Sequence, residues 1–193
     1  MNLKKLLPEL VQGIVDEGYD VNPKPIQSES LPKIKSGADA FFIAPAESGK
    51  TTALAMGVIQ QLKKAKGEAP RSLVLVKSKE DAFALEELFM KLGKHTNLRY
   101  FTVFDQGIIQ YQKNMIYEGL DILIGTPKRI NELMSLTGIP LSGVKLLVVD
   151  DAETFYPTRT HSVIYRLKEA CPKAQFLIFA NNWIENFELL ADR

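Results

Sequence analysis

Short apolar segments alternate with stretches of helical spacing along most of the chain. Continuous apolar runs are typical of strands that helices cover on both sides, so we expect each strand to be buried on both faces. The expected strands are Ala40–Ala44, Leu73–Val76, Tyr100–Phe104, Ile122–Ile124, Leu146–Val149 and Phe176–Phe179. The expected helices between them are Thr51–Lys64, Asp81–Leu92, Ile108–Tyr117, Ile130–Leu136 and Ser162–Glu169. This alternation predicts an α/β fold with a mainly parallel sheet and helices on both faces.

The first residues show a different pattern. Apolar residues recur there at intervals of three and four, at Leu3, Leu6, Leu7, Leu10, Val11, Ile14 and Val15. This spacing predicts one amphipathic helix that Gly18 ends.

Composition excludes several classes of protein. With 193 residues, the chain is long enough to bury a core, and we expect one domain. A single cysteine, Cys171, excludes an internal disulfide framework and favours a cytoplasmic location. No apolar run approaches the ~20 residues that span a bilayer, so we expect no membrane contact. The formal net charge is only +1, so any nucleic-acid contact must come from locally placed Lys and Arg.

The segment 44–52 joins the first expected strand to a helix and has the sequence Ala-Pro-Ala-Glu-Ser-Gly-Lys-Thr-Thr. It differs from a strict phosphate-binding loop in having Ala44 at the first glycine position. In such a loop, backbone N–H groups cradle phosphate oxygens, Lys50 reaches the outer phosphates and Thr51 ligates Mg²⁺. The alternative is an ordinary strand-to-helix turn with a solvated Lys50. The predicted cofactor contacts in the loop are Ala46, Ser48, Gly49, Lys50, Thr51 and Thr52.

A second chemical feature follows the strand Leu146–Val149. The sequence Asp-Asp-Ala-Glu occupies positions 150–153 and places carboxylates at the mouth of a buried strand. In phosphate-loop enzymes an acid at this place holds the Mg²⁺ that bridges nucleotide phosphates, and a neighbouring acid positions water. The alternative is an acidic helix cap, which fits Asp151 alone. Together, the two features predict that Asp150 and Thr51 are Mg²⁺ ligands.

With these two elements aligned, the chain resembles the N-terminal RecA-like domain of DEAD-box RNA helicases over nearly its full length. Gly18-Tyr19 and the segment 23–27 are similar to the Q motif, and 44–51 and 150–153 to motifs I and II. Segments 73–80, 125–129 and 179–183 stand in order at motifs Ia, Ib and III. The resemblance implies a RecA-like phosphate-loop domain of an ATP-dependent RNA helicase, a hydrolase that uses ATP or ADP with Mg²⁺.

The resemblance also implies roles and boundaries. A single domain over residues 1–193 would comprise a Q-motif region, 1–38, and a core, 39–193. Adenine would contact Tyr19 and Gln27, and Asp151 would stand at the position of the catalytic base. RNA, bound weakly and without sequence preference, would contact Lys79, Thr126, Lys128 and Arg129. A second RecA-like domain would be the partner if the protein is longer.

Several motifs depart from the family pattern. Glu47 replaces a loop glycine, Asp151 is one methylene shorter than the family's Glu, and Ala-Asn-Asn replaces Ser-Ala-Thr at 180–182. These changes favour an alternative function, a degenerate and catalytically weak or inactive module that binds RNA or a protein partner. The isolated domain is expected to have little or no activity. An unrelated phosphate-loop kinase or GTPase is disfavoured by Gln27 and by the absence of a guanine-specificity motif.

Overall fold

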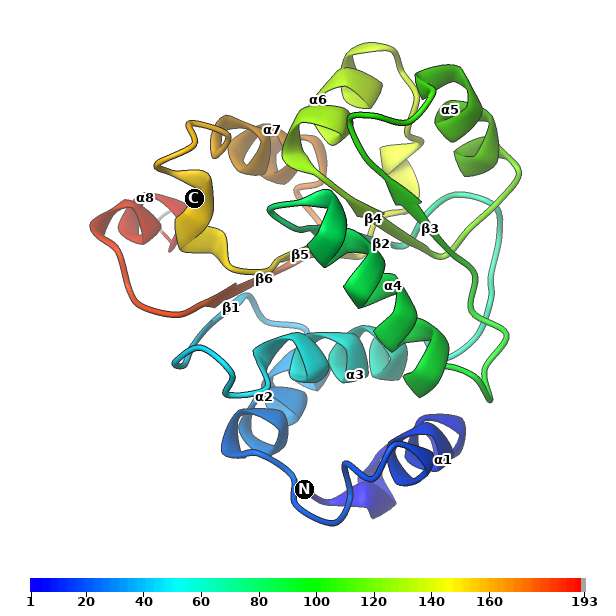
Figure 1. Ribbon diagram of the computed structural model, residues 1–193, viewed down its shortest axis with the longest axis vertical. Coiled ribbons are helices and arrows are strands. Elements are labelled where there is room, and N and C mark those ends of the chain that lie inside the picture. Colours follow the sequence, from blue (N-terminus) through cyan, green and yellow to red (C-terminus); the bar gives the residue numbers. More distant parts are fainter. Residues whose placement is uncertain (192–193) are drawn as a thin grey trace.

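The computed structural model describes residues 1–191, so the last two positions of the predicted domain lie outside the described residues. Six parallel strands form one sheet in the order β1-β6-β5-β2-β4-β3 (Figure 1). The strands are β1 (Ala40–Ile43), β2 (Ser72–Leu75), β3 (Tyr100–Val103), β4 (Ile122–Gly125), β5 (Leu146–Val149) and β6 (Gln175–Ala180). All six predicted strands are confirmed to within one residue at either end.

Helices cover both faces of the sheet (Figure 1). The helices are α1 (Pro8–Asp16), α2 (Pro25–Ser36), α3 (Lys50–Leu62), α4 (Lys79–Leu92), α5 (Ile109–Tyr117), α6 (Pro127–Ser135), α7 (Ser162–Ala170) and α8 (Glu188–Ala191). Buried residues of α1 to α4 share one core cluster, and those of α6 and α7 share the other with Ile116 of α5. The fold is therefore the predicted α/β arrangement. None of the helices in the described part combines the length and apolar composition needed to cross a membrane.

In the N-terminal region one expectation is wrong and one helix was not foreseen. Leu3–Val15 is not one helix, because a 3-10 turn at Leu3–Lys5 is followed by extended residues and α1 begins at Pro8. Proline suits the first position of a helix, because an N–H at that position would have no acceptor within the helix and its absence costs nothing. The helix α2 was not expected at all. It carries Pro32 in its interior and has only a weak apolar stripe, so periodicity gives little signal there.

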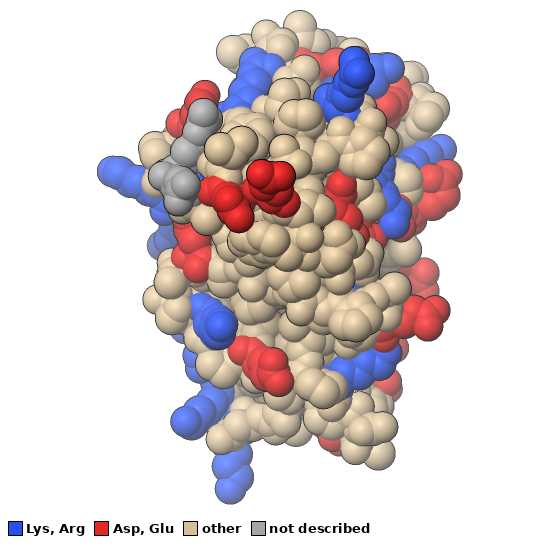
Figure 2. All heavy atoms as spheres, turned by 90° about the vertical axis from the view of Figure 1, so that its left-hand side faces the viewer, with Lys and Arg blue, Asp and Glu red and all other residues tan. Residues whose placement is uncertain are grey.

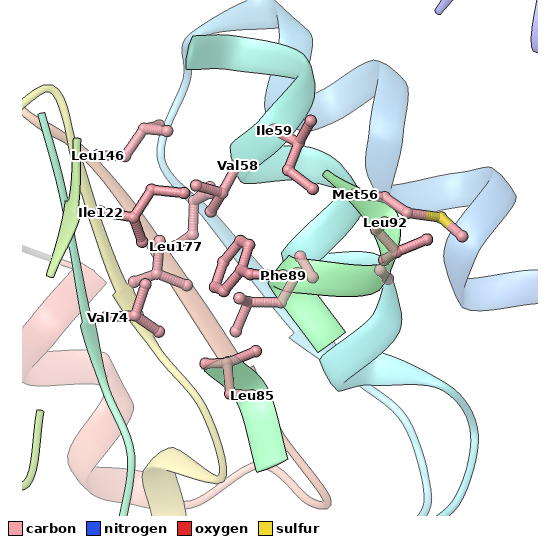
Figure 3. Packing of buried hydrophobic residues seen from close by; sticks show 14 of the residues in the cluster. Met56, Val58, Ile59, Val74, Leu85, Phe89, Leu92, Ile122, Leu146 and Leu177 are labelled. Carbon is pink, nitrogen blue, oxygen red and sulfur yellow. The ribbon is translucent and has the colours of Figure 1, made fainter. Parts of the chain in front are cut away.

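The larger core cluster lies between the sheet and helices α3 and α4. Figure 3 shows Phe89 of α4 lying against Val74 and Leu177, which come from two strands. Val74 and Leu177 are fully or almost fully buried, as expected for inner strands. The edge strands depart from the prediction. In β1 only Phe42 is buried, because a continuous apolar run does not distinguish an edge strand from a central one.

Close packing of α2 on α3 depends on Gly57. A Cβ atom at this position would lie 2.4 Å from Cδ1 of Ile34, well inside contact distance. Glycine therefore lets the backbone of α3 approach the buried Ile34 side chain. This contact packs the C-terminal half of α2 closely against α3.

The face that carries β1 and α8 has a broad central area without charged side chains (Figure 2). Within the described residues, β1 pairs only with β6, so its other edge has no strand beside it. The Trp183 ring packs 5.3 Å from Phe41 of β1 and 5.6 Å from Phe187, yet about half of Trp183 is exposed. The aromatic residue after β6 thus covers one side of the edge strand.

A buried carboxylate ties together the loops that enter β2, β3 and β4. Asp121, which is fully buried, accepts hydrogen bonds from Arg71 Nη2 at 2.7 Å and Arg99 Nε at 2.9 Å. It also accepts from the backbone N–H groups of Lys66 and Arg99. Burial alone would raise the pKa of Asp121, but the hydrogen bonds from Arg99 and Arg71 hold that pKa below its usual value. The carboxylate is therefore ionised and held by cations on two sides.

Replacing Asp121→Asn is expected to lower the free energy of unfolding by about 3 kcal/mol, because two arginines lose their charged partner in a buried setting. Urea or guanidinium unfolding at neutral pH measures this. Asp16→Asn is the matched control, since Asp16 pairs with Lys94 and His95 on the surface and its loss should cost far less. Equal costs for both variants would contradict the assigned role of Asp121.

Candidate functional site

The candidate site forms where β1, β6 and β5 end side by side. Lys50 opens α3 after the loop that follows β1, Asn181 follows β6, and Asp150 follows β5. Because parallel strands end at one edge of a sheet, this order brings the three side chains together. The arrangement matches the predicted location of chemistry at the carboxyl ends of the strands.

The loop between β1 and α3 has two residues in the left-handed region. Gly49 has a φ of 89°, and a Cβ atom there would lie 2.9 Å from Nε2 of Gln27. Glycine is therefore required by conformation and by the neighbouring side chain. Glu47 also has a positive φ, 60°, at a position where a side chain is strained. Its side chain is exposed, and its carbonyl accepts a hydrogen bond from Lys24 Nζ.

Lys50 is the buried centre of the loop, with only 5% of its surface exposed. Its ammonium donates to the carbonyl oxygens of Ala44 at 2.8 Å and Pro45 at 2.9 Å. A third bond, 2.8 Å long, goes to Oδ1 of Asn181. The loop is therefore more than an ordinary turn with a solvated lysine. Ser48 adds a hydroxyl oxygen that is buried without a partner among the described residues, as a site built for a polar ligand would leave it.

Asp150 and Thr51 lie together at the base of the site. The Thr51 hydroxyl donates to Oδ2 of Asp150 at 2.7 Å, and the backbone N–H of Asp151 donates to Oδ1. Burial raises the pKa of Asp150 to about 6, the Thr51 bond opposes the rise and the Asp151 charge adds to it. A buried carboxylate that resists ionisation is a favourable place for a divalent cation, whose charge would stabilise the ionised form.

Few protein ligands surround that position. In residues 1–191 no group of three or more His, Cys, Asp or Glu side chains is placed to hold a metal ion. Mg²⁺ commonly uses one or two protein oxygens and completes its shell with phosphate oxygens and water. Asp150 and Thr51 fit that requirement, but only together with a phosphate ligand.

Asp151 is held by a lysine that the sequence did not assign to this site. Its backbone has a φ of 47°, and its Oδ2 lies 2.8 Å from Lys77 Nζ. The hydrogen bond to Asp151 raises the pKa of Lys77, which therefore stays protonated. The Lys77 ammonium occupies Oδ2 of Asp151, so that oxygen is not free to accept a proton from water.

A cavity of about 370 Å³ extends from Asp150 and Asp151 to the side chain of Tyr19. Thr51 and Thr52 at the start of α3 line it as well, whereas Lys50 and residues 44–49 do not. Gln27 does not line this cavity. It is buried at the start of α2, where its Oε1 accepts from the backbone N–H of Lys24 at 3.0 Å and its amide abuts Gly49.

The predicted RNA contacts divide into two groups. Lys79 and Lys128 line a second cavity, of about 580 Å³, together with Thr126, whose hydroxyl donates to Asp105 at 2.6 Å. Lys79 Nζ lies 4.7 Å from the centre of the Phe104 ring, a cation-π contact. These two lysines are placed at the mouth of the predicted RNA site.

Arg129, expected to contact RNA, is instead buried. Only 4% of its surface is exposed. Its guanidinium donates to Gln112 Oε1 at 2.8 Å, to Gly107 O at 2.9 Å, to Asp105 O and to Glu132. Arginine has five N–H donors in a planar fork, and here they fasten the loop after β3 to α6. Arg129 supports the surface and presents no free charge.

Asn181 and Lys77 are the site residues that sequence reasoning missed. Their positions in the sequence could have indicated them, since each residue comes directly or almost directly after a strand. What the sequence lacked was the strand order, which decides that β6 lies between β1 and β5.

Comparison with known proteins gives consistent matches. The profile described as DEAD/DEAH box helicase matches residues 24–189. The "ATP-dependent RNA helicase me31b" of Drosophila melanogaster is 28% identical over 183 residues, covering 93% of this chain and 39% of the relative. The "ATP-dependent rRNA helicase RRP3" of Debaryomyces hansenii is 35% identical over 153 residues, covering 79% and 32%. This chain therefore spans less than two fifths of either relative.

A solved structure supports the fold independently. A DEAD box protein from the hyperthermophile Methanococcus jannaschii superposes with a TM-score of 0.90 at 20% identity. The match covers 98% of this chain and 52% of that chain. At this identity the likeness establishes the fold alone.

The raised pKa of Asp150 predicts a pH-dependent stability. The folded protein holds this proton up to about pH 6, whereas the unfolded chain releases it near 3.8, so stability falls as pH rises through that window. Asp150→Asn lacks this titration. Its free energy of unfolding relative to the parent should be about 1 kcal/mol more favourable at about pH 7.5 than at about pH 5. Urea unfolding in a chelating buffer measures the difference, and parallel pH curves would show that Asp150 titrates normally.

Proposed function

Because the chain belongs to the DEAD/DEAH box helicase family, we propose that it is the N-terminal ATP- and RNA-binding domain of an ATP-dependent RNA helicase. The observation that carries the proposal is the meeting of Lys50, Thr51 and Asp150 at the ends of neighbouring strands, with the Thr51–Asp150 bond at 2.7 Å. A phosphate-loop lysine, a hydroxyl and a buried acid in this arrangement suit a Mg²⁺-bound nucleotide triphosphate.

Different residues of the site would bind the phosphates, the Mg²⁺ ion and the adenine ring. Loop N–H groups at the start of α3 and the Lys50 ammonium would hold phosphate oxygens, and Asp150 with Thr51 would hold Mg²⁺. Mg²⁺ supplies positive charge that offsets the negative charge of the phosphates. Tyr19 would pack on the adenine ring, and Gln27 would read its edge. Gln27 Oε1 already accepts from the backbone N–H of Lys24, so the base would use the second lone pair of that oxygen and the amide N–H groups.

Slow hydrolysis is the second part of the proposal. Asp151 would position or activate water, but the Lys77 ion pair at 2.8 Å keeps its carboxylate engaged. The contact favours a second candidate function, a weakly active or inactive module that still binds nucleotide or RNA. A second RecA-like domain would supply the arginine finger, an addition typically worth 10³–10⁵ in rate.

RNA binding is proposed for the cavity between α4 and α6. Lys79 and Lys128 would contact the phosphate backbone, and Thr126 would stay with Asp105 as part of the wall. Charges that contact phosphate carry no sequence information, so binding would be independent of sequence. A cytoplasmic location belongs to the same proposal and rests on composition.

The nucleotide site is tested by direct binding. We expect Mg²⁺-ADP to bind with a dissociation constant above about 1 μM, since an isolated domain lacks contacts from a partner. Lys50→Ala should weaken binding at least ~10-fold, the size typical for loss of a charged hydrogen-bond donor. Isothermal titration calorimetry measures both constants. Lys145→Ala, an exposed lysine near the amino end of β5, is the control and should bind as the parent does.

Two results would count against this assignment. Submicromolar binding by the parent would mean that the isolated domain is already complete. Unchanged binding by Lys50→Ala, with the variant's folding verified by thermal melting, would place the nucleotide elsewhere.

The RNA site is tested by salt dependence. Lys79→Ala and Lys128→Ala should each reduce the slope of log K against log salt by about 0.7, the contribution of one phosphate contact on a single strand. Arg129→Ala should leave the slope unchanged and lower the melting temperature, because Arg129 is buried and bonded internally. Fluorescence anisotropy with a labelled single strand measures the slopes. Equal slopes for all three variants would leave the second cavity without a role in RNA binding.

A further inference from the structure

The ammonium of Lys50 has no donor to spare. A lysine carries three N–H donors, and here they are directed to Ala44 O, Pro45 O and Asn181 Oδ1, at distances between 2.8 and 2.9 Å. A phosphate oxygen therefore reaches Lys50 only if one of these acceptors gives way. The two carbonyls belong to the loop itself and lie within six residues of Lys50. Asn181 is the side-chain acceptor among the three.

Glu153 fixes which way the Asn181 amide points. Oε1 of Glu153 accepts from Asn181 Nδ2 at 2.6 Å and from its backbone N–H at 3.2 Å. The amide nitrogen is therefore committed to the carboxylate, and the amide oxygen must face Lys50. The other carboxylate oxygen, Oε2, is buried without a partner among the described residues. This arrangement leaves Asn181 little freedom to withdraw unless a better ligand for Lys50 replaces it.

We propose that Asn181 is an internal ligand of Lys50 that competes with nucleotide phosphate and lowers nucleotide affinity. The proposal rests on the function proposed above and adds a residue that sets the affinity of that site. A neutral amide oxygen is a weaker acceptor than a phosphate oxygen, but it is permanently present beside the lysine. Phosphate must displace it before the full charge-assisted bond forms.

Competition and structural support predict opposite effects. If Asn181 only held the loop in shape, removing it would disorganise the site and weaken nucleotide binding. If Asn181 competes, removing it frees a donor of Lys50 and strengthens binding. The sign of the change therefore separates the two roles.

The test compares neighbouring asparagines. Asn181→Ala should bind Mg²⁺-ADP about 3- to 10-fold more tightly than the parent, the range given by one net hydrogen bond. Asn182→Ala is the matched control, since the Asn182 side chain lies exposed and contacts only the carbonyl of Trp183, at 3.5 Å, among the interactions described. It should bind within about twofold of the parent. Inorganic pyrophosphate should show the same order, because the effect concerns Lys50 and not the base.

A second variant keeps the test decisive if Asn181→Ala folds poorly. Asn181→Leu keeps the side-chain volume but offers no acceptor to Lys50, so it should also bind Mg²⁺-ADP more tightly than the parent. Unchanged or weaker binding by a folded Asn181→Ala or a folded Asn181→Leu would overturn the inference while a binding parent upholds the nucleotide site. No binding by the parent and by both variants would overturn the proposed nucleotide function and the inference with it.

Discussion

The pairing of β6 between β1 and β5 is the constraint on which the site depends. Strand β1 delivers the loop and Lys50, β5 delivers Asp150 and Asp151, and β6 delivers Asn181 between them. The register that pairs Ile43 with Ala180 sets Asn181 one residue beyond the strand end, within reach of the lysine. If β6 were elsewhere in the sheet, the loop and the acids would be neighbours with no amide between them. The electrostatics of the site therefore follow from topology.

The buried carboxylates at the two ends of the sheet, Asp121 and Asp150, have different partners. At the amino end, Asp121 is fully enclosed and receives two arginines, so it is ionised and purely structural. At the carboxyl end, Asp150 receives a hydroxyl and a backbone N–H, which offset only part of the cost of burying its charge. The charge of Asp121 is neutralised by arginines of the same chain, whereas the charge of Asp150 has no such partner among the described residues and could be neutralised by a cation. Such incomplete satisfaction is typical of functional sites, where stability is sacrificed to binding.

The strands and most of the helices could be predicted from the sequence, because continuous apolar runs and helical spacing are local signals, whereas the strand order could not. The failures have local causes: Pro8 divided the first apolar stripe, and α2 has too little amphipathicity to show. In the candidate site, Lys50, Thr51 and Asp150 were expected to lie together from their places after strands, and the structure brings them together, while their binding roles stay a prediction. Arg129 was misjudged because sequence reveals a charge but not its burial, which here depends on acceptors from the loop after β3. Which side chains Lys50 and Asp151 contact required the strand order.

The position of β1 at the edge of the sheet has a consequence for how the protein behaves at high concentration. The strand that carries the phosphate loop pairs on one side only within the described residues, and the face around it is uncharged over a broad area (Figure 2). An open strand edge can accept a strand from another chain, and flanking charges and prolines oppose this. β1 has Asp39 directly before it and Pro45 two residues after it, so strand addition would be confined to its four residues. Ile43 is partly exposed on that edge, at the last residue before the loop. Self-association along this edge would place another chain beside the loop that follows β1. The same strand would then affect both the solubility of the protein and its binding of nucleotide.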